Sequence, residues 1–566
     1  MPLLRQRHPL PSRPLLALIT LLASGCSTIL GLDDFTDATT TGAGGDDTAP
    51  CKLGDARACY DGADETEGVG LCVPGTQTCG ADGTWGACEK QVLPSEEDCN
   101  RRGDEDCDGV GCSDVLWARV SSGGAFRLAT SVAISPKGDR IAMAGIYRGE
   151  INFGPDATKA LPEHPRGGAF LAVFDGDGNH VYSRGVPVPG DSNAVVALDA
   201  ESNVLFATKY AGTVNLGGYD LTASGSSDLL VAKLDADGGH VWSEQFGDLE
   251  GEIGPWDMAA APNGDAVITG AFSQTVTFGG SALEAAESPD RDGFLVRLSG
   301  KDGGHLYSVQ IGDNELYPSG NQYATGVGVD EKGRAVVAGT FVTSVDFGAN
   351  RTLHSDRMEA SGWVAQYGPE GTLLWNTFFD HRDGSTFEIG GVGVDSAGNA
   401  GIVGLFSGKV TFHGTSNSVS VTRETTGTDD DDLFVVRLSA TGNHSWSKRL
   451  GDANKQNWAL PMQGVAFDSE GELVFTGSFL GKVDFGGGEL IADDADWFIA
   501  KFDATGAHRW SHRYGSGAAA QTATSAAIHP ETREIVVAGV SDGAIDLVDP
   551  PLMLDSLSVV IARMAP

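Results

Sequence analysis

Short apolar runs separated by polar turns recur along most of this 566-residue chain. From Trp117 onward the runs are four to seven residues long, rich in Val, Ile, Phe and Ala, and bounded by Gly, Asp and Asn. Runs of this length and composition between turn residues predict β-strands rather than helices. The chain from residue 113 to 566 is therefore predicted to be all-β.

The predicted strands repeat in two alternating elements. The first has two apolar runs around a polar turn, followed by a V-x-F-G step, and it occurs seven times. The second has an apolar strand, a D-x-x-G-like turn and a strand led by an aromatic residue. The aromatic positions recur every 60 to 71 residues, at Tyr182, Trp242, Tyr307, Trp375, Trp446 and Trp510.

This repeat predicts a β-propeller. Each copy supplies four short strands, which is the content of one propeller blade, and seven copies lie within the usual four to eight blades. A β-helical solenoid is the alternative, but its coils are far shorter than these repeats. We therefore expect a seven-bladed β-propeller over residues 113–566.

The two ends of the repeat region complement each other. The seventh copy stops after Ser558–Met564 and lacks the aromatic-led strand, whereas Leu116–Val120 is such a strand without its predecessors. Pairing the first strand with the last copy, beside Val559 and Val560, would close the ring and leave no open blade edge. The sequence thus predicts closure of the seventh blade by the opening strand.

Cysteines are confined to the first fifth of the chain. Eight of the nine lie between Cys51 and Cys112, and none follows. An even number in a short acidic segment predicts a disulfide framework of up to four bridges in an oxidising compartment, with a pairing that the sequence does not fix. Zinc is the alternative, although the pairs Cys72/Cys79 and Cys107/Cys112 are spaced more widely than zinc knuckles. Residues 51–112 are predicted to be a small disulfide-rich module.

The first 25 residues have the pattern of an export signal. A basic start at Arg5, Arg7 and Arg13 precedes an apolar run, Leu15–Ala23, that is too short to span a bilayer. Residues 1–25 are therefore predicted to be a signal peptide.

Ala23-Ser24-Gly25-Cys26 resembles the lipobox of bacterial lipoproteins, although that family prefers Leu where Ala23 stands. The resemblance implies lipidation of Cys26, whose acyl chains would anchor the chain. An ordinary signal peptide with an incidental cysteine is the alternative. Ser27 after the cysteine favours the outer membrane, by the sorting rule of some Gram-negative lipoproteins. The small, polar residues 26–50 are predicted to be a flexible tether.

The charge balance limits the kinds of partner that the protein is expected to bind. With 38 basic and 77 acidic residues the formal net charge is −39. Such a chain repels phosphate backbones and acidic headgroups, so we expect no nucleic-acid partner and membrane contact through the lipid anchor only. The oligomeric state is not defined by the sequence.

A run of acidic residues in the cysteine-rich segment is a candidate cation site. Asp104, Asp106 and Asp108 alternate ahead of Gly109, and carboxylate oxygens in this order favour Ca²⁺. An EF-hand is incomplete here because Val115 stands where the bidentate Glu belongs. The run resembles a metal-binding motif of exported bacterial proteins, D-N-D-C-D-G, with Glu in place of Asn. A solvated acidic turn between disulfides is the alternative.

The repeats from Trp117 to the C-terminus resemble the bacterial seven-bladed-propeller (SBBP) repeat family, which is known from exported and cell-surface proteins. The family implies a fold but no single activity. The turn-plus-tryptophan segment 503–510 also resembles the tryptophan-docking motif of quinoprotein dehydrogenases. The cysteine pair often found in those enzymes is absent from the repeats, so we expect no quinone.

Residues that recur in many blades are expected to serve blade packing rather than chemistry. These are the histidines two positions before the aromatic, the aspartates that enter strands, and the turn aspartates. They are His180, His240, His305, His444 and His508; Asp228, Asp292, Asp432 and Asp496; and Asp199, Asp330, Asp395 and Asp468.

The sequence favours a non-catalytic binding or display module for a protein or glycan at the cell envelope, since the loops vary most between repeats. An envelope lyase or hydrolase with its site over the propeller channel is the alternative. It would need a non-repeating cluster of acids, bases or metal ligands. A third hypothesis makes the cysteine-rich module a cation sensor or adhesive with the propeller as its scaffold.

Overall fold

The computed structural model describes two compact units, one made of residues 51–95 with Cys107 and the other running from Val115 to Pro566. No helix among the described residues is long and apolar enough to cross a membrane. The described residues are 51–63, 66–69, 71–95, 107, 115–123, 126–156, 159–190, 192–285, 291–312, 320–348, 351–355, 359–415, 420–425, 431–451, 464–515, 520–548, 551–554 and 556–566.

The smaller unit is built around disulfides. Strand β1 (Ala56–Cys59) pairs antiparallel with β2 (Gly75–Thr78). The bridges Cys51–Cys79, Cys59–Cys88 and Cys72–Cys107 cross-link it. These three bridges confirm the predicted disulfide framework and suit an oxidising compartment. Cys99 and Cys112 lie outside the described residues, so a fourth bridge stays a prediction.

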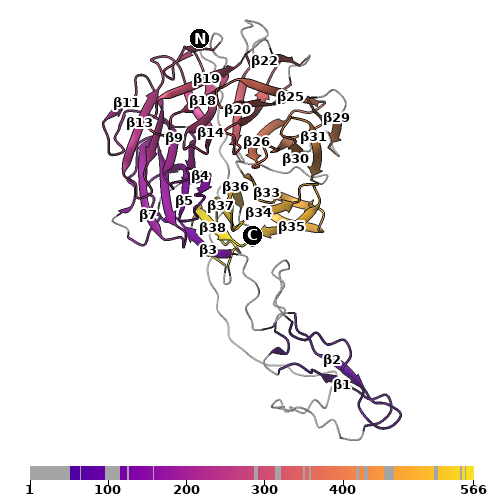
Figure 1. The fold of residues 1–566 in the computed structure, drawn as a ribbon. Coiled ribbons are helices and arrows are strands. Elements are labelled where there is room, and N and C mark those ends of the chain that lie inside the picture. Colours follow the sequence, from indigo (N-terminus) through magenta and orange to yellow (C-terminus); the bar gives the residue numbers. More distant parts are fainter. Residues whose placement is uncertain are drawn as a thin grey trace, which may run out of the picture. The chain divides into compact units, whose positions relative to one another are not determined.

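The larger unit is a propeller of seven antiparallel blades of four strands each, which follow one another around a common centre (Figure 1). We number the blades in chain order. Blade 1 contains β4 (Phe126–Ile134), β5 (Arg140–Arg148), β6 (Gly168–Asp175) and β7 (His180–Pro187). Blade 2 contains β8 (Ala194–Leu198), β9 (Val204–Tyr210), β12 (Asp228–Leu234) and β13 (His240–Phe246). Blade 3 contains β14 (Ile253–Ala260), β15 (Ala266–Phe272), β18 (Asp292–Leu298) and β19 (His305–Ile311).

The remaining blades have the same order of strands. Blade 4 contains β20 (Gln322–Val329), β21 (Ala335–Phe341), β24 (Ser361–Tyr367) and β25 (Leu373–Arg382). The sheet of blade 4 continues through its fourth strand into two further strands, β28 (Lys409–His413) and β29 (Ser420–Glu424). Blade 5 contains β26 (Phe387–Val394), β27 (Ala400–Phe406), β30 (Asp432–Leu438) and β31 (His444–Leu450). Blade 6 contains β32 (Val465–Phe467), β33 (Leu473–Asp484), β34 (Glu489–Phe502) and β35 (His508–Tyr514). Blade 7 contains β36 (Gln521–Ile528), β37 (Ile535–Ser541), β38 (Ser558–Met564) and β3 (Val115–Val120).

The ring closes as predicted. The first strands of successive blades contact one another, and β36 of blade 7 returns to β4 of blade 1. Strand β3 pairs with β38, with Trp117 opposite Arg563 and Val120 opposite Val560. The first strand of the propeller thus supplies the fourth strand of the last blade, and both the seven blades and the closure are confirmed.

The V-x-F-G steps form short additional strands, beyond the four strands predicted for each repeat. They lie between the second and third strands of the blades, and in most blades they form small hairpins. The hairpins are β10 (Thr213–Val214) with β11 (Leu221–Thr222), β16 (Thr275–Val276) with β17 (Leu283–Glu284), β22 (Ser344–Asp346) with β23 (Thr352–His354), and β28 (Lys409–His413) with β29 (Ser420–Glu424). Their Val and Phe side chains, such as Val276 and Phe278, are buried against the blade, which explains why the step recurs.

At six of the seven junctions, the aromatic residue of the fourth strand packs on a turn glycine of the next blade. Gly303 has φ +75°, and a Cβ there would lie 2.9 Å from the Trp242 ring. The indole of Trp242 also donates a hydrogen bond to the Gly300 carbonyl (3.2 Å). The same glycine–aromatic contact joins Gly178 to Trp117, Gly238 to Tyr182, Gly371 to Tyr307, Gly442 to Trp375 and Gly506 to Trp446. The turn glycine and the aromatic therefore recur together because these six junctions use both.

Buried cations, which the repeat pattern did not predict, also link neighbouring blades. In blade 2, the Lys233 ammonium lies 2.7 Å from the carboxylate of the turn residue Asp199 and donates to the Gly300 carbonyl of blade 3 (2.9 Å). Equivalent pairs are Arg297–Asp265, Arg437–Asp395 and Lys501–Asp468. The available signal was a basic residue within an otherwise apolar third strand, as in Leu229–Leu234.

The aspartate that enters the third strand has a structural role as well. Asp228 accepts a hydrogen bond from Gln245 of the fourth strand (3.4 Å), and Asp432 from Arg449 (2.6 Å). These contacts tie the third strand of the blade to the fourth, so the structure confirms the expected packing role.

A buried carboxyl group on the first strand of blade 3 should make stability depend on pH. Asp257 follows a β-bulge in β14, and its two carboxyl oxygens accept the backbone N–H groups of Met258 and of Val327 in blade 4, each at 2.8 Å. Burial raises the pKa of Asp257 to about 7. In the unfolded chain the carboxyl ionises near pH 4, so its contribution to stability is full below about pH 4 and is lost as the pH rises to about 7.

We therefore expect the stability of Asp257→Asn relative to the parent protein to rise between about pH 4 and pH 8, although at pH 4 the amide, with one acceptor oxygen for two N–H groups, makes the variant the less stable protein. The difference in unfolding free energy between the two proteins should change in favour of the variant by up to about 4 kcal/mol across this range, at ~1.4 kcal/mol per pKa unit. Thermal melts over the pH range test this, with Asp237→Asn as control because that side chain is 84% exposed. A variant that is destabilised equally at every pH would contradict the prediction.

Candidate binding site on blades 1 to 3

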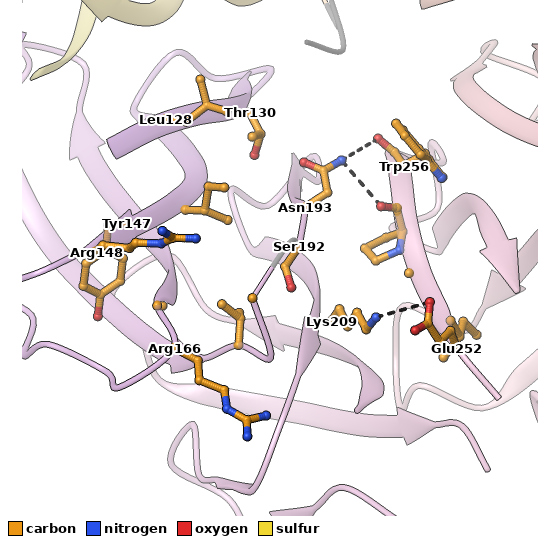
Figure 2. Close-up of a pocket in the computed structure, with 18 of the residues that line it drawn as sticks. Leu128, Thr130, Tyr147, Arg148, Arg166, Ser192, Asn193, Lys209, Glu252 and Trp256 are labelled. Carbon is orange, nitrogen blue, oxygen red and sulfur yellow. Dashed lines mark hydrogen bonds and ion pairs between the residues drawn. The ribbon is translucent and has the colours of Figure 1, made fainter. Parts of the chain in front are cut away.

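A cavity of about 530 Å³ opens on one face of the propeller, over blades 1, 2 and 3 (Figure 2). Its walls come from the starts of β4 and β14, the ends of β5, β9 and β15, and the connection from β7 to β8. Because neighbouring strands are antiparallel, the start of one strand lies beside the end of the next, so all these segments lie at the same end of their sheets. The volume is in the range of small-molecule sites.

An aromatic residue and an amide form one wall. Trp256 occupies the bulge of β14, between Pro255 and Asp257 in the strand register, and a bulge can re-aim a side chain. Asn193, in the connection from β7 to β8, donates a hydrogen bond to the Trp256 carbonyl (3.2 Å). This bond fixes the connection of one blade against the first strand of another, and Figure 2 shows both residues at the same side of the cavity.

The rest of the lining is mainly apolar, with a hydroxyl that lacks a partner. Leu128, Ile146 and Val188 contribute apolar surface. The Ser192 hydroxyl is buried and has no hydrogen-bond partner among the described residues. Because a buried hydroxyl without a partner is costly, a polar atom of a ligand would stabilise this arrangement.

The described lining is basic although the protein is strongly acidic. It contains four cations, Arg148, Arg166, Lys209 and Arg291, and one carboxylate, Glu252. Glu252 lies 2.5 Å from the Arg291 guanidinium and 3.9 Å from the Lys209 ammonium. The cavity is therefore a local positive region suited to an anionic group.

Several lining residues stand at positions where the blades differ. Lys209 of blade 2 occupies a register position that holds only uncharged residues in the other blades, namely Ile146, Ala271, Thr340, Leu405, Ser478 and Val540. The bulge that holds Trp256 in blade 3 holds Thr130, Thr325, Gly390 and Thr524 in blades 1, 4, 5 and 7. These residues do not serve the repeated packing, so they are candidates for binding. An alignment of the repeats against one another could have found both.

The five recurring histidines take no part in this cavity. His240 and His305 each lie within hydrogen-bond distance of a serine three residues on, at 3.0 and 3.1 Å. The glycines that follow the V-x-F-G step pack against their rings, since a Cβ on Gly218 would lie 2.3 Å from His240. Burial lowers the pKa of His305, because desolvation disfavours the imidazolium. The predicted packing role is confirmed.

The other site predictions fall on residues outside those described. Asp104, Asp106 and Asp108, proposed to bind Ca²⁺, and Cys26, proposed to carry lipid, are among these, and both assignments stay predictions. Among the described residues no group of three or more His, Cys, Asp or Glu side chains could hold a metal ion.

Comparison with known protein families and with curated proteins found no match, so the resemblance to SBBP repeats stays a prediction. Solved structures with a similar fold do exist. The Cps50 (Swd1) β-propeller domain of Myceliophteria thermophila aligns over 79% of this chain and 99% of its own, with 9% identity and a TM-score of 0.38. A protein of unknown function from Dyadobacter fermentans aligns over 80% and 98%, with 9% identity and a TM-score of 0.36. At these values the likeness concerns the fold alone and transfers no activity.

Proposed function

We propose that this protein is an exported, lipid-anchored binding module of the cell envelope and that the cavity on blades 1 to 3 holds the end of a glycan. The observation that carries this proposal is the set of non-repeating residues, led by Trp256 and Lys209, gathered on a scaffold whose other positions repeat. A propeller is a common scaffold for binding, and loops and strand ends are where binding surfaces are built.

A glycan suits the cavity better than a peptide. One face of a pyranose ring carries only C–H groups and packs on an aromatic side chain such as Trp256, while its hydroxyls need polar partners. Asn193 and Ser192 line the cavity and can supply them. A protein partner is the alternative occupant.

Binding of a panel of neutral and acidic oligosaccharides and peptides to the full-length protein tests this proposal. We expect Trp256→Ala to abolish glycan binding and Tyr219→Ala to leave it unchanged, because Tyr219 is an exposed aromatic residue of blade 2 outside the cavity. A melting curve confirms that each variant is folded. Binding of peptides alone, or glycan binding that survives Trp256→Ala, would contradict the proposal.

The rival function, an envelope lyase or hydrolase, predicts turnover rather than binding. The only carboxylate in the described lining, Glu252, is engaged by Arg291 and Lys209, an arrangement that favours binding over acid–base chemistry. Incubation with each bound oligosaccharide, followed by analysis for shortened or unsaturated products, distinguishes the two.

The lipid anchor is tested separately. Cys26→Ser is expected to move the protein from the membrane fraction to the soluble fraction, because the acyl chains supply ~0.8 kcal/mol of anchoring per buried methylene. Continued sedimentation with membranes would contradict anchoring at Cys26 and leave the glycan site unaffected.

A further inference from the structure

The described lining of the cavity is positively charged, whereas the chain as a whole is negatively charged. Four cations line the cavity in a protein of net charge −39. The side chain of Lys209 is only 16% exposed, and its ammonium lies 3.9 Å from the nearest carboxylate oxygen, that of Glu252, which leaves room for a closer anionic partner. Arg148 and Arg166 also line the cavity, and no ion pair to an acidic residue is found for either within the described part of the chain. The described part of the lining thus holds four positive charges and one carboxylate.

The carboxylate of Glu252 lies where the anionic group of a ligand could bind in this cavity. One of its carboxylate oxygens, Oε2, is the atom nearest to both Arg291 and Lys209. Glu252 is half-exposed, at 49%, and stands at the start of β14, one residue before the strand begins. Such an exposed ion pair contributes only about 0–1 kcal/mol, so a better-placed carboxylate can displace it.

We propose that the cavity selects an acidic sugar, with the ring carboxylate of a terminal uronic acid residue replacing Glu252 between Lys209 and Arg291. This inference rests on the proposed glycan binding and specifies its ligand. Arginine binds carboxylates through two parallel hydrogen bonds, which gives direction as well as charge attraction. The sugar ring then lies against the apolar wall and Trp256.

The net charge of the protein limits the length of the ligand. Surface charges act over about 8 Å at physiological ionic strength, so the cations of the cavity attract only a nearby anionic group, whereas a protein of net charge −39 repels a long polyanion. A single acidic residue at the end of a chain meets only the local cations. The ligand that fits is therefore one terminal uronate rather than a polyuronate.

The test uses three probes of nearly equal shape on the full-length protein, with calorimetry or ligand-observed NMR as the measurement. The probes are D-glucuronate, its methyl ester and D-glucose. We expect the acid to bind about tenfold more tightly than the ester or glucose, since charge-assisted hydrogen bonds are about twice as strong as neutral ones. Raising the salt concentration should weaken binding of the acid and leave the ester unchanged.

Two variants test whether Lys209 and Glu252 determine the preference for the acid over the ester. Lys209→Met should remove most of the advantage of the acid over the ester, whereas Glu252→Gln should tighten binding of the acid about threefold by removing the competing carboxylate. Lys482→Met is the matched control, because Lys482 pairs with Glu489 on blade 6 (2.9 Å), away from the cavity. Lys482→Met should change the binding of neither the acid nor the ester.

Equal binding of acid, ester and glucose would overturn the inference and leave the proposed glycan site standing. An acid preference that survives Lys209→Met, or weaker acid binding in Glu252→Gln, would overturn the assignment to this pair. Failure of all three probes and of every glycan in the panel would overturn both proposals.

Discussion

Deletion of Leu116–Val120 is expected to open the propeller and lower its melting temperature by several degrees. These residues form most of β3, which supplies the outer strand of blade 7. Without them, β38 would present a row of free N–H and C=O groups along an edge that is now paired. Such an edge favours pairing with another chain, so light scattering should detect association of the deleted protein.

Part of this loss of stability comes from the side chain of Trp117. The Trp117 indole donates a hydrogen bond to the Gly176 carbonyl of blade 1 (3.0 Å), and its ring packs on Gly178. Trp117→Ala should cost about 3 kcal/mol of unfolding free energy, as large-to-small substitutions of packed aromatics do.

Leu116→Ala is the control for Trp117→Ala, since Leu116 lies in the same strand but is 51% exposed, and it should change the stability little. Chemical denaturation measures both variants. An unchanged melt after the deletion, or equal effects of the two substitutions, would mean that the strand does not hold the ring closed.

The architecture was predictable because it rests on local patterns that recur. The aromatic of the fourth strand and the turn glycine form six pairs, and each pair makes one junction, as Trp242 and Gly303 do. The closure was predictable for a similar reason, because a missing strand at one end matched a surplus strand at the other.

The candidate site was not predictable in the same way, since it is built from positions that break the repeat. Lys209, Arg166 and Trp256 come from three blades and meet only once the sheets have packed side by side. No spacing along the chain indicates that meeting. The bulge that holds Trp256 recurs in blades 1, 4, 5 and 7, so the mark of the site in the sequence is a tryptophan where those repeats have Thr or Gly.

The buried cations that join the blades lead to the largest expected effect of a single substitution. Arg297 of blade 3 is 6% exposed, and its guanidinium bonds to the Asp265 carboxylate (2.9 Å) and to the Gly333 carbonyl of blade 4 (3.0 Å). Arg297→Met should destabilise the propeller by about 3–5 kcal/mol, because it leaves a carboxylate buried without its counter-ion. Removing an exposed arginine is the control. Arg509→Met should cost no more than about 1 kcal/mol, since that side chain is 53% exposed.

A second substitution separates charge from packing at this junction. In Arg297→Met/Asp265→Asn neither residue is charged, and replacing a buried ion pair by groups of similar size is often close to neutral. The double variant should therefore regain most of the stability lost in the single one, apart from the hydrogen bond to Gly333, which contributes about 1 kcal/mol. Denaturant melts of the two single variants and the double variant measure the coupling. If the double variant is as unstable as Arg297→Met, the arginine stabilises the junction through its packing and its bond to blade 4, and the pairing of charges is incidental.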